Sequence, residues 1–99
     1  MVLRKITWTK MATRQLQSAI EYIRQDSPIN ADSVKEKILK KVGELGSDKI
    51  AHRKDPFKKN NDGNYLYFEL LRFRIAYYST PKEVFIIRVR HTSMEPKNY

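Results

Sequence analysis

The amino-acid sequence predicts an α+β domain in the order β-α-α-β-β-β, an antiparallel sheet with an αα-hairpin packed on one face. In the first half of the chain, two adjacent stretches space their apolar residues as amphipathic helices do. In the last third, three stretches alternate apolar and polar residues as half-buried strands do. A chain of 99 residues suffices for one modest core, so we expect a single domain over residues 1–99.

The first strand is expected at residues 2–6, where apolar side chains alternate. Thr7 or Thr9 can cap the helix that follows, because a threonine hydroxyl accepts a free backbone N–H of the first turn. Pro28 should end this helix, since proline disfavours helical geometry in the residue before it. The apolar stripe of the helix comprises Ala12, Leu16, Ala19, Ile20 and Ile23.

The second helix is expected to begin at a cap on Asn30 and to end at Gly46. Its apolar stripe comprises Ala31, Val34, Ile38, Val42 and Leu45. Lysines and glutamates occupy the opposite side, as on a solvated helix face. Two amphipathic helices separated only by a proline break predict an αα-hairpin.

A long polar connector follows at residues 47–64. It contains His52 and several lysines, and Asp62 with Gly63 indicates a turn near its end. Loops of this length inside a small domain are often functional.

Three strands are expected at residues 65–71, 72–79 and 83–90. Pro81 marks the turn before the last of them. The connection at residues 71–72 has neither glycine nor asparagine, so its turn type is not predicted. Consecutive strands with short connections predict an antiparallel meander.

The two faces of this meander differ in composition, because side chains alternate across a strand. The face expected against the helices carries Phe73, Ile75, Tyr77, Phe85, Ile87 and Val89. The other carries Arg72, Arg74, Tyr78, Arg88 and Arg90, together with Val84 and Ile86. Arginines beside aromatic rings suit single-stranded nucleic acid, since guanidinium groups bind phosphate and rings stack on bases. An ordinary solvated sheet face is the alternative.

His91 stands at the end of the last predicted strand. Histidine titrates near neutral pH, which suits general acid or base chemistry. Alternation places His91 on the side of Val89, towards the core, which favours a structural role. Both roles stay open from the sequence.

The composition narrows the function classes. A net charge of +9 and a pI near 9.9 attract polyanions or an acidic protein partner. There is no cysteine, no metal-ligand spacing and no phosphate-binding glycine motif, so no metal or other cofactor is expected. The sequence shows no signal-peptide core and no apolar stretch of about 18–20 residues, so we expect a cytoplasmic protein without a membrane partner.

Two segments carry a family resemblance. One is the strand Phe73-Arg74-Ile75-Ala76-Tyr77, and the other is the closing strand at residues 84–91 that ends in His91. With the short first strand, the αα-hairpin and the basic connector, this arrangement resembles the RelE/ParE superfamily of toxins from bacterial type II toxin–antitoxin systems. The resemblance implies a RelE/ParE-like fold and one of two activities. RelE-like members cut messenger RNA on the ribosome without a metal, whereas ParE-like members poison DNA gyrase.

The resemblance also implies site residues. Arg74 matches a strand arginine that serves RNA cleavage in RelE-like members, although ParE-like members carry an arginine there too. The candidate catalytic set is Arg74, His91 and Tyr99 from the resemblance, together with Arg90 from the polar sheet face. The candidate nucleic-acid contacts are Lys54, Lys58 and Lys59 from the resemblance, and Arg72, Tyr78 and Arg88 from the polar sheet face. No glutamate of the chain matches a general base clearly.

From these residues the sequence favours a metal-independent endoribonuclease that acts on messenger RNA at the ribosome. Arginines would hold the scissile phosphate, and His91 or Tyr99 would protonate the leaving oxygen. The alternatives are a gyrase inhibitor without nuclease activity and a non-toxic basic module that binds RNA or a protein. All three are compatible with a cognate acidic antitoxin whose C-terminal segment folds on binding.

Overall fold

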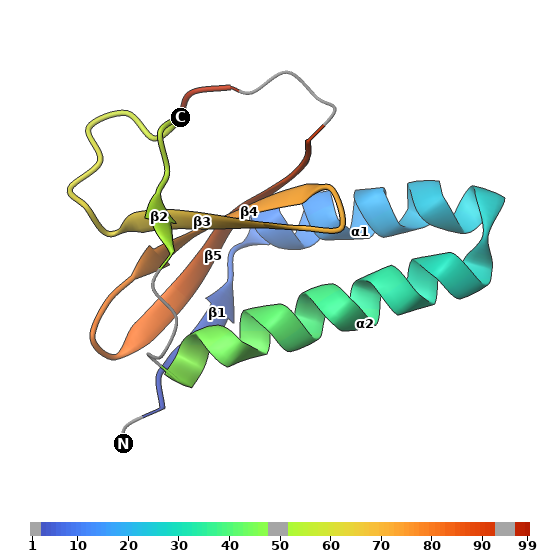
Figure 1. Ribbon diagram of the computed structural model, residues 1–99, viewed down its shortest axis with the longest axis horizontal. Helices are drawn as coiled ribbons and strands as arrows, with labels where there is room; N and C mark the ends of the chain where they lie inside the picture. The colour runs from blue at the N-terminus through green and yellow to red at the C-terminus, as the bar shows by residue number, and fades with distance from the viewer. Residues whose placement is uncertain (1–2, 48–51, 93–96) are drawn as a thin grey trace.

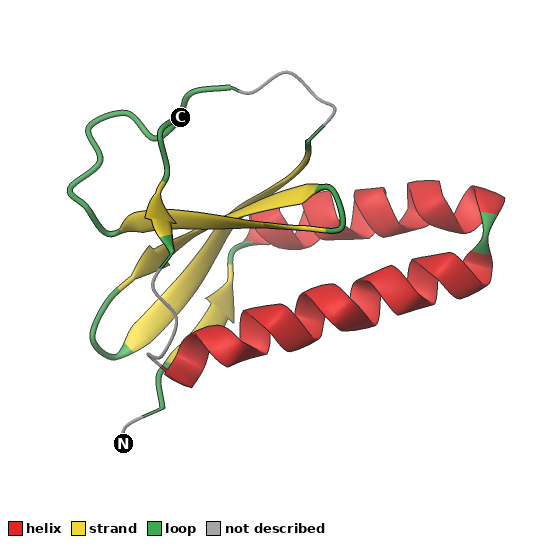
Figure 2. Ribbon diagram, in the orientation of Figure 1, coloured by secondary structure: helices red, strands yellow, loops and turns green. Residues whose placement is uncertain are grey.

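The computed structural model describes residues 3–47, 52–92 and 97–99. It has two layers, a five-stranded sheet and a pair of long helices packed against one of its faces (Figures 1 and 2). The elements are β1 (Lys5–Trp8), α1 (Lys10–Asp26), α2 (Pro28–Glu44), a 3-10 turn η1 (Leu45–Ser47), β2 (Arg53–Lys54), β3 (Tyr65–Leu70), β4 (Phe73–Ser79) and β5 (Glu83–His91). The predicted α+β class and the αα-hairpin are confirmed.

The strands follow the order β1-β5-β4-β3-β2, and β3, β4 and β5 form the predicted antiparallel meander. The prediction of a wholly antiparallel sheet is wrong for β1, which pairs parallel to β5. Alternation within a strand reports its two faces but not the direction of a distant partner, so the sequence pattern could not fix this pairing. The two-residue strand β2, inside the connector, was also not predicted.

The caps of both helices are formed by side chains before their first turns. Thr9 caps α1 as predicted, with its hydroxyl oxygen 3.2 Å from the N–H of Ala12. The prediction of Asn30 as the second cap is wrong, because Ser27 accepts the N–H of Asn30 at 3.2 Å. Pro28 is the first residue of α2, a position where a missing N–H and a fixed φ do no harm.

Both predicted apolar stripes face the sheet. The core contains Ala12, Leu16, Ile20, Ala31, Ile38, Val42 and Leu45 from the helical region and Phe68, Phe73, Ile75 and Tyr77 from β3 and β4. The remaining predicted stripe residues, Ala19, Ile23 and Val34, pack against this core and are partly buried. Within the described ranges, neither α1 nor α2 has the length and apolar character that crossing a membrane requires.

A β-bulge in β5 changes the faces predicted for that strand. Ala76 pairs with Arg88 and Tyr77 with Ile86, so Ile87 is an extra residue without a partner in β4. The core therefore takes Val84 and Ile86, which are fully buried, and not Phe85 and Ile87, which are partly exposed. An inserted residue reverses the alternation on one side of the bulge, and the sequence carries no sign of it.

The turn between β3 and β4 consists of Leu71 and Arg72, at φ angles of 52° and 68°. Both residues lie in the left-handed region, as a two-residue hairpin turn of the primed type requires. Neither is a glycine, so this turn carries local backbone strain.

Candidate functional site

The sheet face turned away from the helices carries a group of aromatic and basic side chains. We call it the tyrosine–arginine face and define it by Tyr65, Tyr67, Arg74, Arg88 and Tyr99. Alternation brings the first four to this face from β3, β4 and β5. Tyr99 reaches it from residues 97–99, which lie beside the connector segment that follows β2 (Figure 1).

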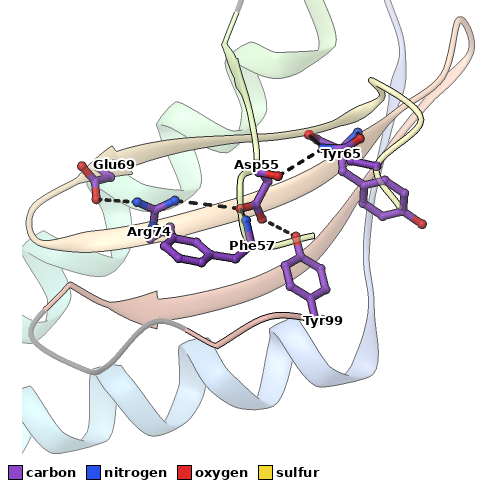
Figure 3. A network of polar contacts seen from close by, with 7 residues as sticks. Asp55, Phe57, Tyr65, Glu69, Arg74 and Tyr99 are labelled. Carbon is purple, nitrogen blue, oxygen red and sulfur yellow. Dashed lines mark hydrogen bonds and ion pairs between the residues drawn. The ribbon is translucent and has the colours of Figure 1, made fainter. Parts of the chain in front are cut away.

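Asp55 lies at the centre of this face and is 3% exposed. Its carboxylate accepts the N–H of Phe57 at 3.0 Å and the hydroxyl of Tyr99 at 2.5 Å, and it lies 3.9 Å from Nη1 of Arg74 (Figure 3). Its own N–H donates to the carbonyl of Tyr65 at 2.8 Å. A buried carboxylate with three such partners fixes the connector onto the sheet.

Sequence reasoning missed Asp55. The only signal was an acidic residue inside a basic stretch, which by itself does not distinguish a buried carboxylate from a solvated one. Its role depends on the approach of β4 and Tyr99, which are distant in the sequence.

The side chain of Arg74 contacts two aromatic rings and lies near two carboxylates. Its guanidinium carbon lies 4.1 Å from the ring centre of Tyr67 and 4.8 Å from that of Phe57. Nη2 pairs with Glu69 at 3.5 Å, while Nη1 has no hydrogen-bond partner among the described residues. The guanidinium thus contacts two rings and lies near the carboxylates of Asp55 and Glu69.

Tyr99 binds the connector through its backbone as well as its side chain. Its N–H donates to the carbonyl of Phe57 at 2.8 Å, and its carbonyl accepts the N–H of Lys59 at 2.7 Å. Burial raises the pKa of the Tyr99 hydroxyl, and the hydrogen bond to Asp55 raises it further. At neutral pH the hydroxyl is therefore a neutral donor to the carboxylate.

Arg88 lies beneath the ring of Tyr99, with 4.4 Å between its guanidinium carbon and the ring centre. It is only 8% exposed, and burial followed by the charge of Arg90 lowers its pKa. Among the described residues no carboxylate, carbonyl or hydroxyl pairs with this guanidinium. Lys58 adds a second cation, 5.5 Å from the ring centre of Tyr99 and 4.7 Å from that of Tyr65.

The structure brings together only part of the catalytic set that the sequence suggested. Arg74 and Tyr99 both contact Asp55. Arg90 lies opposite Arg74 in the backbone register of β4 and β5. His91 lies on the helix side, where its ring meets the ring of Phe73 edge-on at 5.2 Å. His91 therefore lies on the core side of the sheet, where alternation along the strand predicted it.

The residues suggested for nucleic-acid binding are spread over a wide area. Lys54, Lys59 and Arg72 are exposed, and Arg72 sits in the strained turn between β3 and β4. Tyr78 packs its ring 4.6 Å from that of Tyr65. Lys58 and Arg88 are the two that belong to the cluster around Tyr99.

His52 lies between the core and an open hollow of about 320 Å³, which is also lined by Arg53, Tyr67, Phe68 and Glu69. Its Nδ1 shares a 2.6 Å hydrogen bond with the hydroxyl of Tyr77, and its ring lies 5.2 Å from that of Phe68. Burial lowers the pKa of His52, and the charge of Lys41 lowers it further. Burial also raises the pKa of Tyr77 to about 12. Within the described ranges no cluster of histidine, aspartate and glutamate could hold a metal ion.

A groove of about 980 Å³ lies on the helix side of the sheet. The hairpin of α1 and α2 extends beyond the sheet there (Figure 1). The lining includes Arg14, Tyr22, Ile23, Val34, Phe73 and His91. The groove is therefore apolar at its base, with basic groups from α1 and β5 at its edge.

Comparisons with known proteins agree with this architecture. The family model described as "ParE toxin of type II toxin-antitoxin system, parDE" matches residues 6–96. A solved structure titled "Chromosomal ParDE TA system from P. aeruginosa" superposes with a TM-score of 0.72 at 19% sequence identity, covering 90% of this chain and 96% of that one. A search of the curated proteins found no match.

Proposed function

We propose that this chain, which belongs to the ParE toxin family of type II toxin–antitoxin systems, acts by binding and inhibiting DNA gyrase and not by cutting RNA. The family match supports this choice. The observation that carries it is the closed network around Asp55, which engages Arg74 and Tyr99 while His91 lies on the other side of the sheet.

Metal-independent RNA cleavage needs a base, an acid and an anion-binding group within hydrogen-bond reach of one phosphate. Arg74 lies against the ring of Tyr67 and within 3.5–3.9 Å of two carboxylates, which compete with a phosphate for its charge. The raised pKa of Tyr99 makes its hydroxyl a poor acid near neutral pH. These features favour a binding function for the tyrosine–arginine face and not a catalytic one. The ribonuclease hypothesis retains one support, the shared location of Arg74, Arg88 and Tyr99.

The tyrosine–arginine face is our candidate for the gyrase-binding surface. Tyrosine and arginine are the residue types that most often dominate the binding free energy of protein interfaces. The ring of Tyr67, already packed against the guanidinium of Arg74, loses little conformational entropy on binding, which favours affinity.

The groove under the helical hairpin is our candidate site for the cognate antitoxin. Its apolar base suits the apolar face of an amphipathic helix, and Arg14 at its edge suits acidic residues on that helix. The net charge of +9 should make association with an acidic antitoxin fast and sensitive to salt. Two faces of the sheet would then serve two partners.

Two assays with the same purified protein test this proposal. We expect inhibition of DNA supercoiling by purified gyrase, and no new messenger RNA ends by primer extension in a translating extract. New RNA ends that disappear in Arg74→Ala, with supercoiling unaffected at excess protein, would establish the ribonuclease instead.

Two arginine variants separate the faces. Arg88→Gln should weaken gyrase inhibition by about tenfold or more and leave antitoxin affinity unchanged. Arg14→Gln is the matched control on the helix side, and it should weaken antitoxin binding alone. Equal effects of both variants in both assays would contradict this division.

A further inference from the structure

We infer that Tyr99 is a displaceable latch over a peptide-binding site, and that the ligand of this site is an extended acidic segment of a protein partner. The inference rests on the proposed role of the tyrosine–arginine face in partner binding and adds how that face opens. Residues 97–99 occupy the site in the closed state seen here. Their contacts show which chemical groups a competitor must supply.

The backbone contacts of Tyr99 indicate that the ligand of the site is a peptide. Phe57 offers a carbonyl and Lys59 an N–H, and Tyr99 satisfies both as a neighbouring strand would. When Tyr99 leaves, these two groups lose their partners. An extended peptide replaces an N–H and a carbonyl at this spacing, whereas a nucleic acid backbone offers neither as a pair.

The charge of Arg88 indicates that the peptide ligand carries an acidic residue. In the closed state Arg88 as a whole residue is 8% exposed, its guanidinium carbon lies 4.4 Å from the ring centre of Tyr99, and no hydrogen bond or ion pair joins it to an oxygen of the described residues. Burial disfavours the charge of Arg88, and the nearby carboxylate of Asp55 and the ring of Tyr99 offset only part of the lost hydration. A carboxylate in the place of the ring would remove this cost and form two parallel hydrogen bonds.

The groups that hold the latch can be released separately from the core. The hydroxyl of Tyr99 binds Asp55, which keeps the N–H of Phe57 and the charge of Arg74 after Tyr99 departs. Water can occupy the remaining position on the carboxylate. Opening therefore exposes Arg88 and the two backbone groups without uncovering any residue of the hydrophobic core.

The test uses the full chain and a synthetic peptide, with no gyrase present. The probe is the end-blocked octapeptide of four Thr-Glu repeats, and its control has Thr-Gln repeats. Isothermal titration calorimetry measures affinity, and NMR follows the amide of Lys59 and the Nε–H of Arg88. Tyr99→Ala keeps the two backbone hydrogen bonds but removes the ring over Arg88 and the hydroxyl bonded to Asp55, so it weakens the latch. We expect this variant to bind the Thr-Glu peptide about tenfold more tightly than the unaltered chain, the gain expected if the latch is open about a tenth of the time in the unaltered chain and most of the time in the variant.

Tyr78→Ala is the matched control, because Tyr78 lies on the same sheet face and its ring packs on Tyr65, with no arginine among the described residues stacked against it. It should bind the peptide as the unaltered chain does. The Thr-Gln peptide should bind Tyr99→Ala only slightly more tightly than it binds the unaltered chain. This comparison tests the role of the peptide carboxylates without altering Arg88.

Three results would overturn the latch. These are equal affinity of Tyr99→Ala and the unaltered chain, equal binding of both peptides, and a gain for tripolyphosphate or a single-stranded oligonucleotide without a shift of the Lys59 amide. The last result would assign the site to phosphate. Because the assay contains no gyrase, failure of the latch would leave the supercoiling result intact, and failure of gyrase inhibition would leave the peptide result intact.

Discussion

The two faces of the sheet are covered in different ways. On the helix side, α1 and α2 bury a continuous set of apolar residues that includes Ile75, Val84 and Ile86. On the other side, the connector and Tyr99 cover the sheet through separate polar contacts that converge on Asp55. The helix side cannot open without the loss of the core, whereas the polar side can exchange one contact for another. The same alternating strands thus form a permanent surface and an exchangeable one.

The largest expected effect lies on the helix side. Ile86→Ala removes a fully buried side chain from β5 and should lower the free energy of unfolding by about 2–5 kcal/mol. Urea denaturation measures it. Phe85→Ala, at the neighbouring partly exposed position, should cost less. An equal cost for both would mean that the bulge does not select which residue enters the core.

A smaller effect is expected for the centre of the polar side. Asp55→Asn keeps the shape of the side chain but weakens its bonds to Tyr99 and Arg74. Hydrogen bonds to a charged group contribute about 1.5–3 kcal/mol, so the loss of stability should fall in that range. Amide hydrogen exchange should show faster exchange at Lys59 and no change in the core of β4. Uniform acceleration throughout the sheet would show that the two sides are not separable.

The stability of the fold should depend on pH through His52, which bonds to Tyr77 of the core. The folded-state pKa of His52 is lowered by burial, so the unfolded chain binds this proton more readily. The stabilisation is complete above the unfolded pKa of about 6.5 and is lost as the pH falls below it. Chemical denaturation at pH 7.5 and 5.5 should show this decline, and His52→Gln should reduce it. An unchanged pH dependence in the variant would remove His52 from this role.

The smallest expected effect is a gain. Arg72 has a φ of 68°, which glycine adopts without strain. Arg72→Gly should raise the free energy of unfolding by about 0.5–1 kcal/mol, because relief of the left-handed strain, about 1–2 kcal/mol, exceeds the entropic cost of glycine in the unfolded chain, about 0.5–1 kcal/mol. Thermal denaturation measures the change. A clear loss of stability would show that the Arg72 side chain contributes contacts that outweigh the strain.

Helical periodicity predicted α1 and α2 with their buried residues, because one stripe of each helix packs on the sheet. Alternation predicted β4 in the same way, but it failed for Phe85 and Ile87, since a single extra residue in β5 reverses the faces. The candidate site was predicted in part. Arg74, Arg88 and Tyr99 do lie together, but Asp55, which joins two of them, acquires its role only through tertiary contacts.

The parallel pairing of β1 with β5 has a consequence for synthesis of the chain. β1 emerges from the ribosome first, yet its hydrogen-bonding partner is the last strand of the sheet. At roughly 5–20 residues per second, translation leaves β1 unpaired for several seconds. During that time Ile6 and Trp8, which pack against the finished core, stay without their neighbours. A nascent chain interrupted before residue 83 therefore lacks the strand that completes the sheet, so the molecule acquires its working surfaces only after β5 has been made.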